Sequence, residues 1–231
     1  YYLVGISEMA VQLEFLKSVL YFSNLGPAEL ESIREFIFEK TVDRAEIVLL
    51  EGESAENLYF VASGVVKVFK TSIEGKEQIL SIVRPGESFN DVPIFDGGLN
   101  PVSAQAMGPV LLYGIKQTDI ETVVKDHPQI ALNIIKVLAS RVRHLVSLVA
   151  DLSFKHVVGR VAKILAEHVG GEMSHGPRLT QQEMAAMAGT VREVVGRSLK
   201  ELEEAGAIKL DHHRIVIMDK ESLQNIAETA Y

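Results

Sequence analysis

The sequence predicts an α+β protein in which an N-terminal antiparallel β-roll of jelly-roll type is followed by a long helix and a C-terminal winged helix-turn-helix. Three observations support this prediction. Between Val42 and about Lys116, short β-rich runs are separated by Gly-containing turns roughly every 8–12 residues. Apolar residues then recur at helical spacing from His127 to Leu152. Finally, two short helices joined by a tight Gly turn are expected at Thr180–Gly206.

The composition narrows the class of protein. The 231 residues suffice for one large or two modest domains. The chain has no Cys, which excludes disulfides, cysteine-ligated iron–sulfur clusters and thiol catalysis. We find neither a signal-peptide pattern nor an apolar run that could span a membrane, so we expect a cytoplasmic protein. No HExxH motif, phosphate-binding Gly loop or Ser/His/Asp arrangement stands out, and we expect the protein not to be an enzyme.

The N-terminal part begins with helices and continues as the roll. Residues 9–40 are expected to be helical with one interruption, the second helix starting at Pro27 and running to Lys40. The run VVKVFKTSIEGKEQILSIV predicts a hairpin that turns near Glu74-Gly75. Further turns of the roll are expected at Gly52, Gly64 and Gly86.

A short helix over Gln117–Lys125 precedes the long one. Along the long helix, a heptad seam with alternating spacings of four and three is expected at Ile134, Leu138, Arg141, Leu145, Leu148 and Leu152. Such a seam could pack on its own domain, but a helix of this length between two domains favours a parallel homodimer. Arg141 interrupts the seam and would need a partner there, or it could face the roll instead.

The chain is expected to change direction around Ser153–His156 and to continue as a helix from Phe154 to Val169, with Lys155 and Lys163 exposed. These observations predict three parts: a roll over 1–126, a dimerisation helix over 127–152 and a C-terminal domain over 153–231.

Two capping boxes are expected in the helix-turn-helix, Thr180 with Glu183 and Thr190 with Glu193. Gly189 suits the left-handed turn that ends the first helix. The second helix has an apolar face and a polar face. The apolar face is expected to bury Val191, Val194, Val195, Leu199 and Leu202, and the polar face presents Arg192, Glu193, Gly196, Arg197 and Lys200.

The polar face suits DNA reading. Two guanidiniums beside a side-chain-free position can bond guanine O6 and N7, and Glu193 can accept from cytosine N4. The alternative is an ordinary solvated helix surface, with Glu193 serving only as a cap. After Gly206, the run AIKLDHHRIVIMD predicts two strands around an Asp211-His212-His213 turn, the wing, and ESLQNIAE predicts a closing helix. Adjacent histidines in a polar turn are usually solvated, so we expect no metal site there.

The net charge of −8 is unusual for a DNA-binding protein, but it is unevenly distributed. From Ser153 onward there are 10 basic and 11 acidic residues, whereas residues 1–152 carry 13 and 20. The C-terminal domain must therefore depend on a local basic patch, and we expect its DNA affinity to be moderate and salt-dependent.

The run LTQQEMAAMAGTVREVVGRSLKELEEAGAI resembles the helix-turn-helix of the cyclic-AMP receptor protein and fumarate–nitrate regulator (CRP/FNR) family of bacterial transcription factors. NLYFVASGVVKVF and RPGESF resemble the family's roll, and the likeness extends from about residue 12 to 228. It implies a cyclic-nucleotide-binding-like jelly roll, allosteric control by a small ligand, a homodimer on pseudo-palindromic DNA, and RNA polymerase as a partner.

Carried over by position, the resemblance implies that Arg192, Glu193 and Arg197 read bases. It places the DNA backbone against Thr180, Gln181, Gln182, Thr190 and Lys200. One of the backbone positions is often Arg in the family and is Gln here, which removes a charge.

The effector segment departs from the family pattern. Asp91 stands near the position of a ribose-binding Glu, and Pro101-Val102 stand where Arg-Ser/Thr is expected. Leu145 and Val146 occupy the adenine-contacting positions on the long helix. Without the guanidinium, a buried phosphate would lack its main countercharge, so we do not expect cyclic AMP to be the effector. The candidate effector pocket comprises Phe89, Asn90, Asp91, Ser103, Arg141 and Leu145.

Four effector hypotheses remain: an apolar ligand, haem, another small molecule, or activity without any ligand. The segment FNDVPIFDGG resembles that of the family's haem-linked, nitric-oxide-responsive regulators. No His lies between Tyr1 and Lys125, so a haem would need His127, His144 or a non-His ligand. The rival to a DNA-binding regulator is a ligand-binding module that acts through a protein partner.

Overall fold

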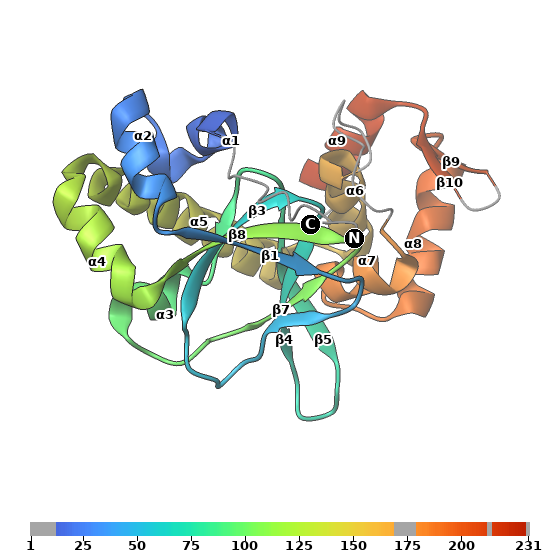
Figure 1. Ribbon diagram of the computed structural model, residues 1–231. Coiled ribbons are helices and arrows are strands. Elements are labelled where there is room, and N and C mark those ends of the chain that lie inside the picture. Colours follow the sequence, from blue (N-terminus) through green and yellow to red (C-terminus); the bar gives the residue numbers. More distant parts are fainter. Residues whose placement is uncertain (1–12, 169–178, 212–213, 230–231) are drawn as a thin grey trace, which may run out of the picture. The chain divides into compact units, whose positions relative to one another are not determined.

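The computed structural model describes residues 13–168, 179–211 and 214–229 (Figure 1). The chain forms two compact units, the first comprising residues 1–66 and 83–139, and the second residues 67–82 and 140–231. Both helices and sheets are present, as the α+β prediction requires. In the described part of the chain, no helix is both long and apolar enough to cross a membrane.

The first unit opens with α1 (Leu13–Ser18), the 3₁₀ helix η1 (Leu20–Phe22) and α2 (Pro27–Arg34). The prediction that the second helix reaches Lys40 is wrong, because Ile37–Val42 form strand β1. This strand pairs antiparallel with β8 (Val110–Lys116), from Ile37 opposite Ile115 to Val42 opposite Val110. The segment is rich in aromatic and β-branched residues, which favour a strand once a partner strand is available.

The strands form two four-stranded sheets, as expected for a roll (Figure 1). The first has the order β1-β8-β3-β6, with β3 at Asn57–Ser63 and β6 at Ser88–Phe89. The second has the order β2-β7-β4-β5, formed by Ile47–Leu49, Ser103–Ala106, Val66–Thr71 and Glu77–Val83. The predicted turn glycines Gly52, Gly64, Gly75 and Gly86 all have positive φ, which confirms the turns of the roll.

Helices and strands share the apolar core of the first unit. Leu16, Phe22, Leu58, Phe60 and Ile130 are at most 2% exposed within it. The core also includes residues of α4 (Gln117–Asp126) and of the N-terminal part of α5 (Pro128–Phe154). Both helices begin and end within two residues of their predicted bounds.

A polar network joins three segments of the first unit. The Tyr21 hydroxyl donates to the Asp91 carboxylate at the start of α3 (Asp91–Asp96). The Asn133 amide on α5 donates to the backbone carbonyls of Tyr21, at 3.0 Å, and Ser23, at 2.9 Å. The segment around η1 therefore bonds both α3 and the long helix.

The second unit contains a helical core and the predicted wing hairpin. The predicted break after the long helix is confirmed, because α5 ends at Phe154 and α6 (Val157–His168) begins three residues later. A buried cluster including Val161, Leu165, Val195, Leu199 and Leu223 joins α6, α8 (Arg192–Glu204) and α9 (Lys220–Thr229). Strands β9 (Ile208–Asp211) and β10 (Arg214–Ile217) form the predicted hairpin, whose His212-His213 turn lies outside the described residues.

Candidate nucleic-acid interface

The first helix of the motif, α7 (Gln181–Ala188), begins with the predicted capping box. The Glu183 amide donates to the Thr180 hydroxyl at 3.1 Å, and the Thr180 amide donates to the Glu183 carboxylate at 2.6 Å. Thr180, Gln181 and Gln182 are exposed around this helix start. Exposed polar groups and backbone amides at a helix N-terminus can bond phosphate oxygens.

The turn after α7 depends on Gly189. Its φ of 64° lies in the left-handed region, and its amide donates to the Ala185 carbonyl. A Cβ at this position would lie 2.7 Å from Cδ2 of Leu152. Gly189 thus supplies both the backbone conformation and the space that the turn requires.

Replacing Gly189 with Ala is expected to destabilise the second unit by about 1–3 kcal/mol, because it adds left-handed strain and overlap with Leu152. Urea denaturation measures the loss. Gly206→Ala is the matched control, since Gly206 has φ +76° but open space around its Cβ position. If both variants lost the same free energy of unfolding, the overlap with Leu152 would not contribute to the destabilisation.

The second predicted capping box is wrong. Helix α8 begins at Arg192, its N-cap is Val191, and no side chain caps it. The Thr190 amide instead donates to the Ala185 carbonyl at 3.0 Å, so Thr190 belongs to the end of α7. Val191, predicted to be buried, is 50% exposed. The turn extends past Gly189, so the N-cap of α8 lies one position later than predicted.

The polar face of α8 is as predicted. Arg192, Glu193, Arg197 and Lys200 are exposed, whereas Val195, Leu199 and Leu202 on the opposite face are buried. A Cβ at Gly196 would meet no described atom within 4 Å, so nothing in the described part of the chain explains this mid-helix glycine. Within the described residues, neither arginine has a salt-bridge partner. Two free guanidiniums beside an open position form a surface that can approach a groove wall closely.

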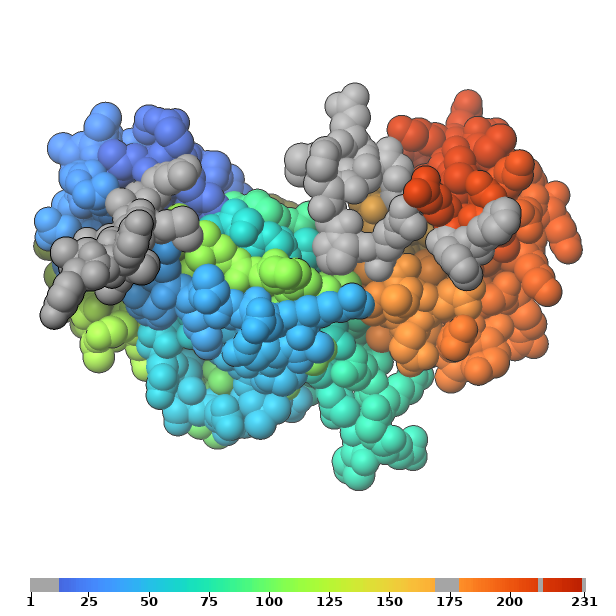
Figure 2. Space-filling view, turned by 45° about the vertical axis from the view of Figure 1, so that its right-hand side comes forward, coloured from blue at the N-terminus to red at the C-terminus, as the bar shows by residue number. Residues whose placement is uncertain are grey.

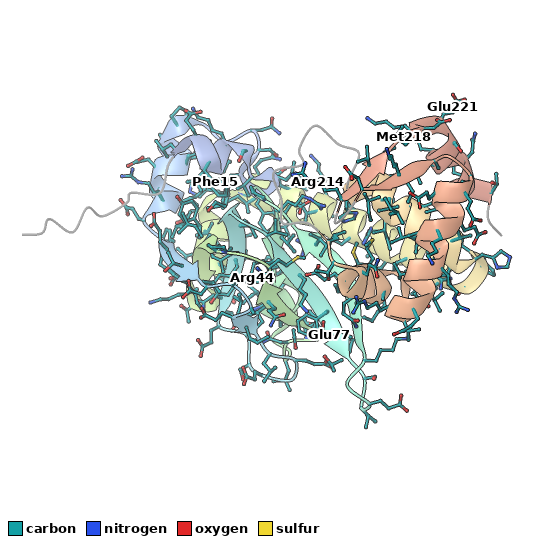
Figure 3. All side chains as sticks on the ribbon, turned by 90° about the vertical axis from the view of Figure 1, so that its right-hand side faces the viewer. Phe15, Arg44, Glu77, Arg214, Met218 and Glu221 are labelled. Atoms are coloured by element: carbon teal, nitrogen blue, oxygen red, sulfur yellow. The ribbon has the colours of Figure 1, made fainter. Side chains whose placement is uncertain are left out.

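The sequence reasoning did not single out the cations of the wing. Lys209 and Arg214 are exposed on the hairpin, while their neighbours Leu210 and Ile215 pack against the core. Figure 3 shows Arg214 near one end of β10 and Met218 just beyond the other. The strict alternation of the two predicted strands could have revealed the two cations, because it places Lys209 and Arg214 outward.

The candidate effector segment is buried and rich in hydrogen-bond acceptors. Phe89 stacks on Tyr59, with ring centroids 5.4 Å apart. The Asn90 amide donates to the Asn57 carbonyl at 3.0 Å, but its own Oδ1 is buried and has no partner among the described residues. The Asp91 carboxylate accepts from Tyr21 and, at 3.0 Å, from Ser88.

The next part of the segment continues this pattern. The Ser103 hydroxyl accepts from the Glu51 amide at 3.0 Å. Asn100, which was not predicted from the sequence, donates to the Leu50 carbonyl at 3.2 Å, and its Oδ1 is also buried with no partner in the described part of the chain. No Lys or Arg occurs between Arg84 and Lys116. This part of the roll therefore offers acceptors and no positive charge.

The remaining candidates for the effector pocket lie elsewhere in the chain. Arg141 is half-buried and Leu145 is 46% exposed, both on the part of α5 that belongs to the second unit. Phe89, Asn90, Asp91 and Ser103 belong to the first unit, where they occupy β6, the start of α3 and β7.

The two candidate haem ligands are hydrogen-bonded. In His127, Nε2 lies 3.0 Å from the Ser32 hydroxyl and Nδ1 lies 3.8 Å from the Glu29 carboxylate. In His144, Nε2 lies 3.2 Å from the Leu80 carbonyl. The Nε2 atom of His127 is thus within hydrogen-bond distance of Ser32, whereas its Nδ1 atom lies beyond hydrogen-bond distance of Glu29. Among the residues the structure describes, no group of three or more His, Asp or Glu side chains could hold a metal ion, while His175, His212 and His213 lie outside them.

The predicted dimer seam is only partly exposed in this structure. Ile134 is 6% exposed, and Ile134 and Leu138 both pack in the core of the first unit. Leu148 and Leu152 are half-buried. The exposed apolar residues with alternating spacings of four and three lie one position further along the helix. This stripe comprises Leu132, Ile135, Val142, Val146 and Val149, each 55–65% exposed, with Ala139 between them.

Comparison with known proteins reveals similarity over nearly the whole chain. The profile of the cyclic nucleotide-binding domain matches residues 39–127, and that of the Crp-like helix-turn-helix domain matches residues 159–226. The CRP-like cAMP-activated global transcriptional regulator of Mycobacterium tuberculosis is 30% identical over 217 residues, covering 91% of this chain and 97% of the relative. The cyclic AMP receptor protein of Thermus thermophilus is 29% identical over 212 residues, covering 92% and 98%.

Solved structures agree on the fold. The structure of FixK2 from Bradyrhizobium japonicum superposes with a TM-score of 0.74 at 23% identity, over 84% of this chain and 99% of that chain. The Thermus thermophilus catabolite activator protein gives a TM-score of 0.54 at 28% identity, over 92% and 100%.

Proposed function

Because the chain belongs to the family of CRP-like transcriptional regulators, which bind DNA and are not enzymes, we propose that Arg192, Glu193 and Arg197 read its operator. The observation that carries the proposal is the exposed face of α8, where two arginines with no salt-bridge partner among the described residues lie on either side of the open position at Gly196. Each arginine can bond guanine O6 and N7, and Glu193 can accept from cytosine N4.

Phosphate contacts would come from around the reading helix. Thr180, Gln181 and Gln182 at the start of α7, Thr190 in the turn and Lys200 on α8 are the proposed backbone contacts, as their positions in the family's motif imply. Lys209 and Arg214 on the wing add two cations to this surface. These contacts position the protein without selecting a sequence.

The proposed dimer interface is the exposed stripe on α5. A row of large apolar side chains at alternating spacings of four and three is the pattern of a two-stranded coiled coil. The family acts as dimers, and the stripe supplies a surface for a parallel pair. Two copies of α8 would then enter successive major grooves, about 34–36 Å apart on a pseudo-palindrome.

Selection from random double-stranded DNA tests the function. We expect an enriched inverted repeat whose half-sites lie about one helical turn apart. Failure to enrich any inverted repeat would favour the rival, a regulatory module that acts through a protein partner.

We propose that the effector is not a cyclic nucleotide. The effector segment lacks a cation to neutralise a phosphate, and its Asn90 and Asn100 oxygens and Asp91 carboxylate are acceptors. This chemistry suits an uncharged or donor-rich small molecule. The effector of this chain is thus expected to differ from that of the relatives named cAMP-activated.

Haem is the alternative effector, and it would use His127, His144 or a non-His ligand. The Nε2 atom of each histidine is hydrogen-bonded in this structure, so either histidine would bind iron through Nδ1 or after losing that bond. The absorption spectrum and mass of whatever co-purifies with the protein distinguish the two proposals. A Soret band would support haem. A bound cyclic nucleotide would contradict the argument from the missing cation.

We further propose that the regulator works in the cytoplasm with RNA polymerase as its protein partner. Support comes from the β4–β5 hairpin, whose tip carries the fully exposed Ile73 and is visible in green at the lower edge of Figure 2. An isolated apolar side chain on a protruding turn suits a protein contact.

The effector would act by binding the DNA-competent state more tightly than the alternative state.

A further inference from the structure

A single guanidinium connects two parts of the second unit. Arg160 Nε donates to the Ala188 carbonyl at 2.8 Å, and Arg160 Nη1 donates to the Lys155 carbonyl at 2.5 Å. Ala188 is the last residue of α7, directly before the turn, and Lys155 lies in the break between α5 and α6. Arg160 therefore bonds the break and the helix-turn-helix turn at once.

The turn needs such donors. The last carbonyls of a helix have no partner within it, and a cation near them is favoured by the helix dipole. Besides Arg160, the Gln78 amide on β5 donates to the Met187 carbonyl at 3.3 Å. Side chains from two other elements thus bond the last two carbonyls of α7.

The break is also held from the side of α5. The Asp151 carboxylate pairs with Lys155 at 3.0 Å and with Lys163 at 2.5 Å, so the two lysines predicted to be exposed are engaged. Burial raises the pKa of Asp151, but the hydrogen bonds from Lys163 and Lys155 outweigh it and hold that pKa below its ordinary value. Burial lowers the pKa of Arg160, and the negative charge of Asp151 opposes this effect.

We propose that Arg160 is a positioning residue for operator recognition, fixing the direction of α8 relative to the end of α5 and so setting the half-site spacing that the dimer accepts. Helix α8 begins only four residues after Ala188, so the place of the turn decides where the reading arginines point. The planar guanidinium can bond two carbonyls at fixed directions, which a lysine ammonium cannot reproduce. This inference rests on the proposed function, because spacing matters only if a dimer reads two half-sites.

The test repeats the DNA selection with Arg160→Met, Arg160→Lys and the control Arg34→Met. Arg34 is a surface guanidinium on α2, paired with Glu31, so its replacement removes a similar group far along the chain. We expect the wild type and the control to enrich one spacer length. Arg160→Met should enrich the same half-site with several spacer lengths and bind the wild-type operator about tenfold more weakly, with Arg160→Lys in between.

The outcomes are distinguishable. If Arg160→Met selects the wild-type spacer alone with wild-type affinity, the inference is overturned. If its melting curve shows that it does not fold, Arg160→Lys decides: a broadened spacer distribution supports the inference and an unchanged one overturns it. If the wild type itself enriches no inverted repeat, it is the proposed function that has failed.

Discussion

Replacing Val142 with Glu is expected to convert the dimer into monomers and to weaken operator binding about a hundredfold or more. Val142 lies in the middle of the exposed stripe on α5, and a carboxylate there would be buried without a partner in the paired helices. Monomers bind each half-site singly, so they lose the gain in effective concentration that linkage provides, typically 10²–10⁴-fold. Sedimentation equilibrium measures the dimer, and fluorescence anisotropy measures DNA binding.

Ser140→Glu is the matched control for this variant. It adds the same charge to an exposed position of α5, away from the stripe, and should leave the dimer intact. A dimer that survives Val142→Glu but dissociates with Leu145→Glu would instead restore the register first predicted from the sequence. All three substitutions lie on α5 and leave the reading face of α8 unchanged.

Replacing Arg197 with Ala is expected to weaken binding to the selected operator by about 1–3 kcal/mol per half-site and to relax base preference at one step. The loss arises because the bonds to guanine O6 and N7 disappear while the dimer and the turn remain. Binding to random DNA should fall much less. Anisotropy titrations on both DNAs over a range of salt concentrations measure the two effects.

Lys200→Ala provides the comparison. As a proposed phosphate contact, its loss should weaken binding to every sequence about equally and reduce the salt slope by about one. If Arg197→Ala caused the same loss on operator and random DNA, the base-reading role of this arginine would be refuted.

Signals within a few residues were sufficient to predict much of the fold. The capping box at Thr180, the left-handed Gly189 and the break near Ser153–His156 depend on local backbone requirements, and the structure contains all three. The same local reasoning failed at Thr190. Its spacing to Glu193 fits a capping box, but the Thr190 amide is already used to end the previous helix.

The other errors depend on partners that are distant in the sequence. Nothing local in Ile37–Val42 reveals that β8 will pair with it. Along α5, two adjacent rows of apolar residues fit a heptad equally well. Only the packing of Ile134 and Leu138 into their own core shows which row remains exposed.

The sequence alone predicted only which charged group the effector site lacks. The lack of a cation near Pro101 is visible in the sequence, but the unpartnered oxygens of Asn90 and Asn100 become apparent only when their amides are seen to bond the carbonyls of Asn57 and Leu50. Such bonds depend on the folded roll, so spacing along the chain cannot predict them.

The bonds made by Tyr21 and Asn133 have a practical consequence for making shorter versions of the protein. The segment around η1 is tied through the Tyr21 hydroxyl to Asp91, and through the Asn133 amide to the long helix. A fragment that lacked the segment around η1 but kept the strands and the long helix would remove a donor from Asp91 and leave the Asn133 amide without these acceptors. Fragments made for crystallisation or ligand screening should therefore begin upstream of Leu13.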